Sequence, residues 1–181
     1  MVYGTVAKRA WWGAVVAVFV VAAPGLIARH DACDTPPTVV LLVRHAEKAG
    51  TPAADPPLTT EGTARAGALV RLARDSGART IYATEFLRTR QTVEPLGAQL
   101  GIKVTTRPAA DVDGLVADIR EKRRGEVVVV AGHSNTIPQI IQKLGGGTVP
   151  VIAESDFDNL YVVTIPCCGN AKTVRLHLAE R

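Results

Sequence analysis

Aromatic residues are scarce in this sequence of 181 residues and make up only 4% of it. Both tryptophans, Trp11 and Trp12, fall within the first dozen positions, so the rest of the chain must form its core without tryptophan. Because 47% of all residues are hydrophobic, we expect a mainly aliphatic core. The same apolar content excludes a disordered chain, and the 16 glycines and 11 prolines follow no collagen-like period.

A strong charge of one sign is also lacking, because the formal net charge is +4. Lys8 and Arg9 supply two of these charges, which leaves a weakly basic domain that suits a small anionic substrate. The one dense basic cluster, at 122–124, has no aromatic residues between its cations. It therefore favours a solvated helix end, and we expect no nucleic acid partner.

The N-terminal segment carries no charged residue from Ala10 to Ala28 and follows Lys8 and Arg9. This order is typical of a secretory signal, although the apolar length is also close to the roughly 20 residues of a membrane helix. We predict a signal peptide or membrane anchor with a short linker over 1–37 and one folded domain over 38–181. The protein is thus expected to be exported, periplasmic or extracellular, with residues 10–28 as a candidate membrane tether.

Cysteine is limited to Cys33, Cys167 and Cys168. In an oxidising compartment, a bond between Cys33 and one of the other two would join the N-terminal tail to the C-terminal part of the domain. No second Cys-x-x-Cys or histidine pair accompanies them, so the cysteines do not predict a zinc site.

Apolar runs predict the architecture. Residues 38–43 and 127–131 are continuous β-branched and aliphatic runs, typical of strands buried on both faces. Further strands are expected at 80–83 and 102–106, with helices at 60–73, 86–100, 112–122 and 136–144. Residues 160–165 and 173–178 predict a terminal hairpin. The alternation predicts an α/β fold with three layers, α/β/α, around a mostly parallel central sheet with a C-terminal hairpin.

Polar residues follow the predicted strands at the points where ligands bind in open α/β sheets. The candidates are Arg44 and His45 after the first strand, Thr84 and Arg88 after the second, Asp111 after the third, and His133 and Ser134 after the fourth. A single histidine at the end of a strand would favour a core residue whose hydrogen bonds are satisfied within the protein. Two histidines together with two arginines favour a functional site.

Phosphate chemistry fits these residue types. Arginine guanidinium groups and helix N-termini bind phosphate oxygens, and two arginines near an imidazole disfavour its protonated form. One neutral histidine can then act as a nucleophile while the second donates to phosphoryl oxygens, and the arginines stabilise charge without a metal or cofactor. A zinc hydrolase would require a third ligand, and no Gly-x-Gly-x-x-Gly supports a dinucleotide site.

Four motifs carry a family resemblance: Leu-Leu-Val-Arg-His-Ala-Glu-Lys at 41–48, Leu-Thr-x-x-Gly at 58–62, Thr-x-x-x-Arg-Thr-x-Gln-Thr at 84–92 and Gly-His-Ser-Asn at 132–135. Through them, residues 38–178 resemble the histidine phosphatase superfamily, with its phosphoglycerate mutase-like fold, and in particular small members of its branch 1. The resemblance implies that His45 is the nucleophile and forms a phosphohistidine. It also implies that Arg44, Arg88 and His133 line the phosphate pocket, and we add the adjacent Ser134.

Members of this family usually also have a carboxylate that protonates the leaving group. Asp111 fits the expected loop best, with Asp113 and Glu47 as substitutes. The short connections leave no room for large insertions that cover the substrate, so we expect an open pocket and disfavour a mutase. The expected function is an exported phosphatase that acts on small phosphomonoesters. The alternatives are a phosphohistidine protein phosphatase and a phosphate- or phosphoester-binding module without turnover.

Overall fold

The structure is a computed structural model that describes Met1 and residues 35–178. The predicted membrane-targeting segment at 10–28 and Cys33 lie outside the described residues. Within residues 35–178, no helix combines the length and the apolar character needed to cross a bilayer.

A six-stranded sheet forms the centre of the domain, in the order β3-β2-β4-β1-β5-β6. Its strands are β1 (Thr38–Arg44), β2 (Ala78–Thr84), β3 (Thr105–Arg107), β4 (Val127–Gly132), β5 (Asn159–Ile165) and β6 (Lys172–His177). The first four strands in chain order pair in parallel, whereas β5 pairs antiparallel with both β1 and β6. The predicted mostly parallel sheet with a C-terminal hairpin is therefore confirmed.

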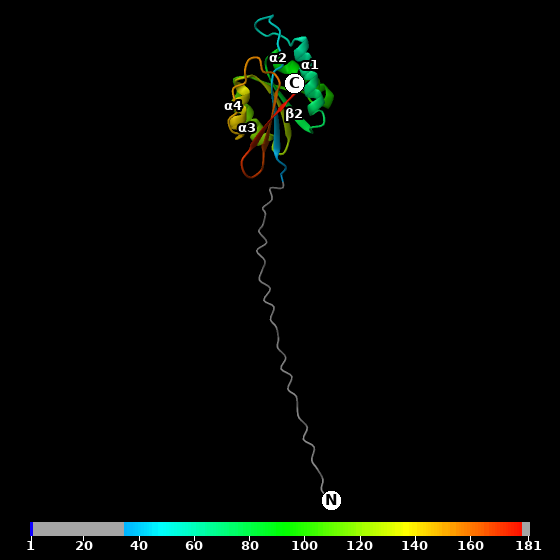
Figure 1. Ribbon diagram of the computed structural model, residues 1–181, viewed down its shortest axis with the longest axis vertical. Coiled ribbons are helices and arrows are strands. Elements are labelled where there is room, and N and C mark those ends of the chain that lie inside the picture. Colours follow the sequence, from blue (N-terminus) through cyan, green and yellow to red (C-terminus); the bar gives the residue numbers. More distant parts are fainter. Residues whose placement is uncertain (2–34, 179–181) are drawn as a thin grey trace. The chain divides into compact units, whose positions relative to one another are not determined.

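Four helices cover the two faces of this sheet (Figure 1). They are α1 (Thr60–Ala73), α2 (Leu87–Leu100), α3 (Val112–Lys122) and α4 (Thr136–Lys143). Successive side chains of a strand point to opposite faces, so Val40 and Leu42 pack with α3 and α4 while Leu41 and Val43 pack with α1 and α2. This explains why the run at 38–43 is continuously apolar, and it confirms the three-layer prediction.

The third strand is shorter than predicted because the residues before it serve the end of α2. Gly101 ends that helix in a left-handed conformation with φ 67°, and the amide of Ile102 donates to the carbonyl of Gly97 at 2.8 Å. Ile102 and Val104 pack against the core on the α1 and α2 side. Consequently only Thr105–Arg107 joins the sheet, at its edge beside β2.

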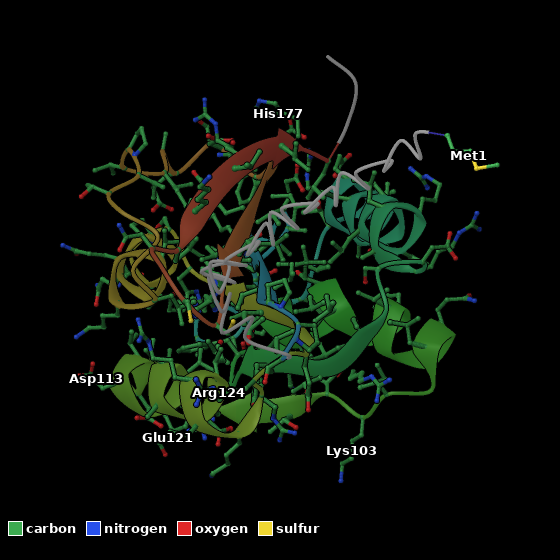
Figure 2. The ribbon with its side chains drawn as sticks, turned by 90° about the horizontal axis from the view of Figure 1, so that it is seen from below. Met1, Lys103, Asp113, Glu121, Arg124 and His177 are labelled. Atoms are coloured by element: carbon green, nitrogen blue, oxygen red, sulfur yellow. The ribbon has the colours of Figure 1, made fainter. Side chains whose placement is uncertain are left out.

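The β5–β6 hairpin brings the last described residues of the chain onto the sheet. In the described part of the chain neither Cys167 nor Cys168 is a free thiol. Figure 2 shows His177 at the end of β6, Asp113 and Glu121 on the outer side of α3, and Arg124 just beyond the end of that helix. The Asp113 and Glu121 side chains therefore lie on the exposed side of α3.

Candidate active site

The carboxyl ends of β1, β2 and β4 meet beside a pocket of about 460 Å³. Its lining residues are Arg44, His45, Lys48, Phe86, Arg88, Ala109, Ala110, His133, Ser134, Asn135, Thr136 and Glu154. Five of the seven candidates thus line one pocket. Of the other two, Thr84 lies behind it against His133, and Asp111 is not part of it. A second cavity, of about 350 Å³, opens beside the start of β1, and no histidine lines it.

His45 is held with one ring nitrogen free to react. Its ring Nδ1 lies 2.8 Å from the carbonyl oxygen of Ala46, and because a carbonyl only accepts, Nδ1 must carry the proton. Burial, opposed in part by this bond, lowers the pKa of His45 to about 4, and the charge of Arg44 lowers it further. The ring is therefore neutral at neutral pH, and the lone pair is on Nε2.

The loop after His45 is tied to α2 through a threonine. The amide of Ala46 donates to Oγ1 of Thr92 at 3.0 Å, and the same hydroxyl donates to the carbonyl of Arg88 at 2.7 Å. Thr92 is 3% exposed, so few other partners can replace it. This contact explains why a threonine ends the motif at 84–92: it connects the loop after His45 to the helix that carries Arg88.

The start of α1 is tied to the same loop. The hydroxyl of Thr59 caps the helix by accepting from the amide of Gly62 at 3.1 Å, and the amide of Thr59 donates to the carbonyl of Glu47 at 2.9 Å. A Cβ atom on Gly62 would lie only 2.2 Å from that carbonyl oxygen. The Leu-Thr-x-x-Gly motif therefore permits close approach of α1 to the loop that follows His45.

His133 faces His45 across the pocket, with ring centroids 5.4 Å apart and planes at 63°. Its Nε2 lies 3.1 Å from the hydroxyl of Thr84, which itself lies 2.7 Å from the hydroxyl of Thr89. The Phe86 ring packs edge-on against the His133 ring, with the two ring centroids 5.4 Å apart. Burial, and then the charge of Arg88, lowers the pKa of His133 to about 4, so this ring is also neutral at neutral pH.

The two arginines place positive charge beside these neutral rings. The Arg44 guanidinium lies 4.2 Å from the centre of the Phe157 ring, and that of Arg88 lies 4.2 Å from the centre of the Phe86 ring. Among the described residues, the buried Nε atoms of Arg44 and Arg88 have no hydrogen-bond partner. These N–H groups are donors that an anion can satisfy.

Glu154, between α4 and β5, lines the pocket and was not among the predicted site residues. Its Oε2 accepts from Nη2 of Arg44 at 2.9 Å, and its Oε1 accepts from the hydroxyl of Ser134 at 2.8 Å. It precedes an antiparallel strand, whereas the predicted site residues were those that follow the parallel strands. No sequence signal distinguishes Glu154 from an ordinary surface acid, and its side chain is in fact 82% exposed.

The structure does not bring the predicted acid Asp111 into this pocket. Its carboxylate caps α3 by accepting from the amide of Gly114 at 3.0 Å, and it pairs with Arg107 at 2.9 Å. Asp113 pairs with Lys143 at 2.7 Å. Glu47 accepts two hydrogen bonds from Nε of Arg65, at 2.9 and 3.0 Å. None of these carboxylates lines the pocket.

Metal ligands do not gather in the described part of the chain: residues 35–178 contain no group of three or more His, Cys, Asp or Glu side chains suited to a metal ion. The pocket instead combines two imidazoles, two guanidinium groups and a serine hydroxyl. That donor set is suited to a phosphate group.

Comparison with known proteins supports this interpretation. Residues 40–111 match the family model of the histidine phosphatase superfamily (branch 1), while no curated protein sequence matches the chain. Among solved structures, the protein histidine phosphatase SixA complexed with tungstate is similar with a TM-score of 0.65 and 22% identity, over 77% of this chain and 97% of that one.

Two further structures share the fold. A mycobacterial glucosyl-3-phosphoglycerate phosphatase aligns with a TM-score of 0.61 and 14% identity, over 78% of this chain and 98% of its own. A putative alpha-ribazole-5'-P phosphatase from Escherichia coli aligns with a TM-score of 0.60 and 15% identity, over 80% of this chain and 97% of its own. The family match over residues 40–111 and the shared fold of the whole domain therefore confirm that this chain resembles branch 1 of the histidine phosphatase superfamily.

Proposed function

We propose that this protein is a metal-independent phosphatase that hydrolyses small phosphomonoesters through a covalent phosphohistidine on His45. The observation that carries the proposal is the neutral His45 ring, whose Nδ1 proton is held by the Ala46 carbonyl so that Nε2 has a free lone pair. His133 and the two arginines surround it in one pocket and supply donors for the transferring phosphoryl group.

The reaction has two halves. In the first, Nε2 of His45 attacks phosphorus, the N–P bond forms and the ester P–O bond breaks, which releases the alcohol. In the second, water attacks the phosphohistidine, the N–P bond breaks and inorganic phosphate leaves. Arg44 and Arg88 stabilise the negative phosphoryl oxygens in both halves, which is how the site can work without a metal.

The test is phosphate release from an aryl phosphate by the purified protein, with and without a chelator, compared with a His45→Ala variant. We expect chelator-insensitive turnover in the parent and a loss of about three orders of magnitude or more in the variant. A phosphoenzyme that is stable in alkali and labile in acid should be trapped from the parent alone. Turnover lost only with chelator would contradict the metal-independent reaction.

A parent protein that binds phosphate without turnover would instead favour the binding module. Equilibrium dialysis with inorganic phosphate distinguishes this result from an inactive preparation. Under the binding-module alternative, the parent binds phosphate and an Arg88→Ala variant binds it more weakly, since Arg88 is the less tethered of the two arginines.

A phosphohistidine protein phosphatase is the second candidate, and the similarity to the protein histidine phosphatase SixA favours it. Such an enzyme must accept a bulky substrate, and the short connections of this chain leave the pocket open to one. Phosphate release from a phosphohistidine-carrying protein, measured beside a small phosphomonoester, separates the two candidates by their kcat/KM ratio.

We further propose that the protein acts outside the cytoplasm. The support is the sequence of Lys8 and Arg9 followed by the uncharged segment 10–28, as in a secretory signal or an anchor. Fractionation of expressing cells, with the N-terminal sequence of the recovered protein, tests both alternatives. An intact N-terminus in the membrane fraction indicates the tether, and an intact protein confined to the cytosol contradicts export.

A further inference from the structure

The carboxylate of Glu154 joins two of the groups proposed to bind phosphate. One oxygen accepts from Nη2 of Arg44 at 2.9 Å and the other accepts from the Ser134 hydroxyl at 2.8 Å. A carboxylate bound by a guanidinium and a hydroxyl imitates two oxygens of a phosphate. A phosphoryl group that enters the pocket and binds Arg44 and Ser134 must therefore displace this side chain.

The backbone that carries Glu154 is fixed independently of its carboxylate. Nη1 of Arg44 donates to the carbonyl oxygens of Ala153 at 2.7 Å, Glu154 at 2.9 Å and Asp156 at 3.2 Å. Arg44 is only 4% exposed, so this anchor is largely protected from water. Displacing the carboxylate from Nη2 would leave the three Nη1 bonds in place, and Glu154 would remain at the pocket.

We propose that Glu154 is the proton donor of this site: the substrate phosphate displaces its carboxylate from Arg44 and Ser134, and the displaced side chain protonates the leaving oxygen. The inference rests on the phosphohistidine reaction proposed above. It also rests on direction, because His45 is only 4% exposed whereas the Glu154 side chain is 82% exposed. In-line attack from the buried His45 ring points the leaving oxygen away from that ring, toward the exposed side of the pocket.

Displacement of Glu154 by phosphate would also change the protonation state of its carboxyl group. In the free site the hydrogen bond from Ser134 and the charge of Arg44 hold the pKa of Glu154 below its ordinary value, so the group is a carboxylate. A bound phosphate removes both contacts and places negative charge beside the carboxylate, and each change raises its pKa. The charged and titratable groups around it are Arg44, His45, Lys48, Arg88, His133 and Asp156.

The proton balance closes over the two halves of the reaction. As the N–P bond to His45 forms and the ester P–O bond breaks, the leaving oxygen takes the proton of Glu154 and departs as an alcohol. The resulting carboxylate then takes a proton from the attacking water while the O–P bond forms and the N–P bond breaks. Glu154 is then protonated again, as in the substrate complex, where it held a proton taken from solvent on binding, and it returns that proton to solvent when phosphate leaves.

Three other carboxylates near the pocket form contacts outside it. Asp111 caps α3 and Glu47 is held by Arg65. Glu85, which follows β2, accepts from the amide of Ala109 at 2.7 Å. None of the three lines the pocket, whereas Glu154 does.

The experiment compares Glu154→Gln with the parent on two substrates, a nitrophenyl phosphate and a simple alkyl phosphate, and measures kcat/KM for each. A nitrophenolate departs without a proton, whereas an alkoxide needs one. We expect the variant to lose about 10²-fold or more on the alkyl phosphate and less than about threefold on the nitrophenyl phosphate. Glu121→Gln on the outer side of α3 (Figure 2) is the matched control and should retain parental values on both substrates.

Several outcomes would overturn the proposal. Equal losses on both substrates, or none on either, would show that Glu154 does not supply the proton, and a lower KM with an unchanged substrate ratio would show that it merely competes with phosphate. A selective loss in Asp111→Asn or Glu85→Gln would assign the proton to that residue instead. Failure of the phosphohistidine reaction itself is recognised separately, because His45→Ala would then retain turnover or the parent would have none.

A binding measurement tests the displacement without turnover. Sulfate, a tetrahedral dianion that does not titrate in this pH range, is titrated calorimetrically in two buffers that differ in ionisation enthalpy. We expect the parent to take up more protons per bound sulfate than Glu154→Gln, at a pH of about 6. Equal uptake by the two proteins would overturn the proposed change in protonation.

Discussion

At the residue scale, the two pocket histidines make the stability of the protein depend on pH. Their pKa values are lowered to about 4 by burial, against about 6.5 in an unfolded chain. Between these values the unfolded chain binds protons that the folded chain does not, so stability falls as pH decreases from about 6.5 toward 4. Between about pH 7 and pH 5 the loss should be about 2 kcal/mol for each histidine, measured by urea unfolding. His133→Gln should show about half of the parental loss, and an undiminished loss would contradict the assignment.

Also at the residue scale, Thr92→Val tests how the loop after His45 is held. The substitution keeps the shape of the side chain but leaves the buried amide of Ala46 without its acceptor, at a cost of about 1–3 kcal/mol in the free energy of unfolding. Because the carbonyl of Ala46 orients His45, kcat should fall as well. Thr63→Val is the control, since the Thr63 hydroxyl bonds its own helix at an exposed position. Equal stabilities and rates in both variants would show that the Thr92 contact does not hold the loop.

At the element scale, two glycines of α1 should respond with opposite sign to the same substitution. Gly62→Ala places a Cβ 2.2 Å from the carbonyl oxygen of Glu47, so either the helix or the loop after His45 must move. We expect destabilisation of about 2 kcal/mol or more, with reduced activity. At Gly67 the new Cβ would meet only Nη1 of Arg71, at 3.8 Å, and Gly67→Ala should stabilise the protein by about 0.5–1 kcal/mol through helix propensity. Thermal unfolding of both variants measures the two effects. A stabilising Gly62→Ala would contradict the close approach of α1 to the Glu47 carbonyl.

At the scale of the whole molecule, the buried apolar side chains form two clusters, one on each face of the sheet beneath a layer of helices. Leu42→Ala removes a fully buried side chain from the central strand and should cost about 2–5 kcal/mol in urea unfolding. Leu176→Ala on the edge strand β6 is the matched control, because that side chain is 47% exposed, and it should change stability by less than about 1 kcal/mol. Similar costs for the two variants would mean that β6 is covered in solution, for example by a second copy of the chain.

Most of the fold could be predicted from local patterns. The helix expected at 112–122 is Val112–Lys122, because the Asp111 cap and the spacing of Leu115, Val116 and Ile119 are both local signals. The strand expected at 102–106 was placed too early, because Ile102 is used at the end of α2 rather than in the sheet. The bond from Ile102 to Gly97 is local, whereas the residues that join the sheet are selected by pairing with β2, which is distant in the sequence.

The sequence by itself determined the strands, the helices and the residues that follow each parallel strand, which is why Arg44, His45, Arg88, His133 and Ser134 could be named together. These positions are readable because apolar runs mark the strands and parallel strands direct their carboxyl ends to one edge. Only the tertiary structure decided which carboxylate reaches the pocket. Asp111 and Glu154 are equally ordinary acids in the sequence, but the turn into α3 uses the first as a helix cap, while a guanidinium 110 residues away holds the second at the pocket that contains both histidines.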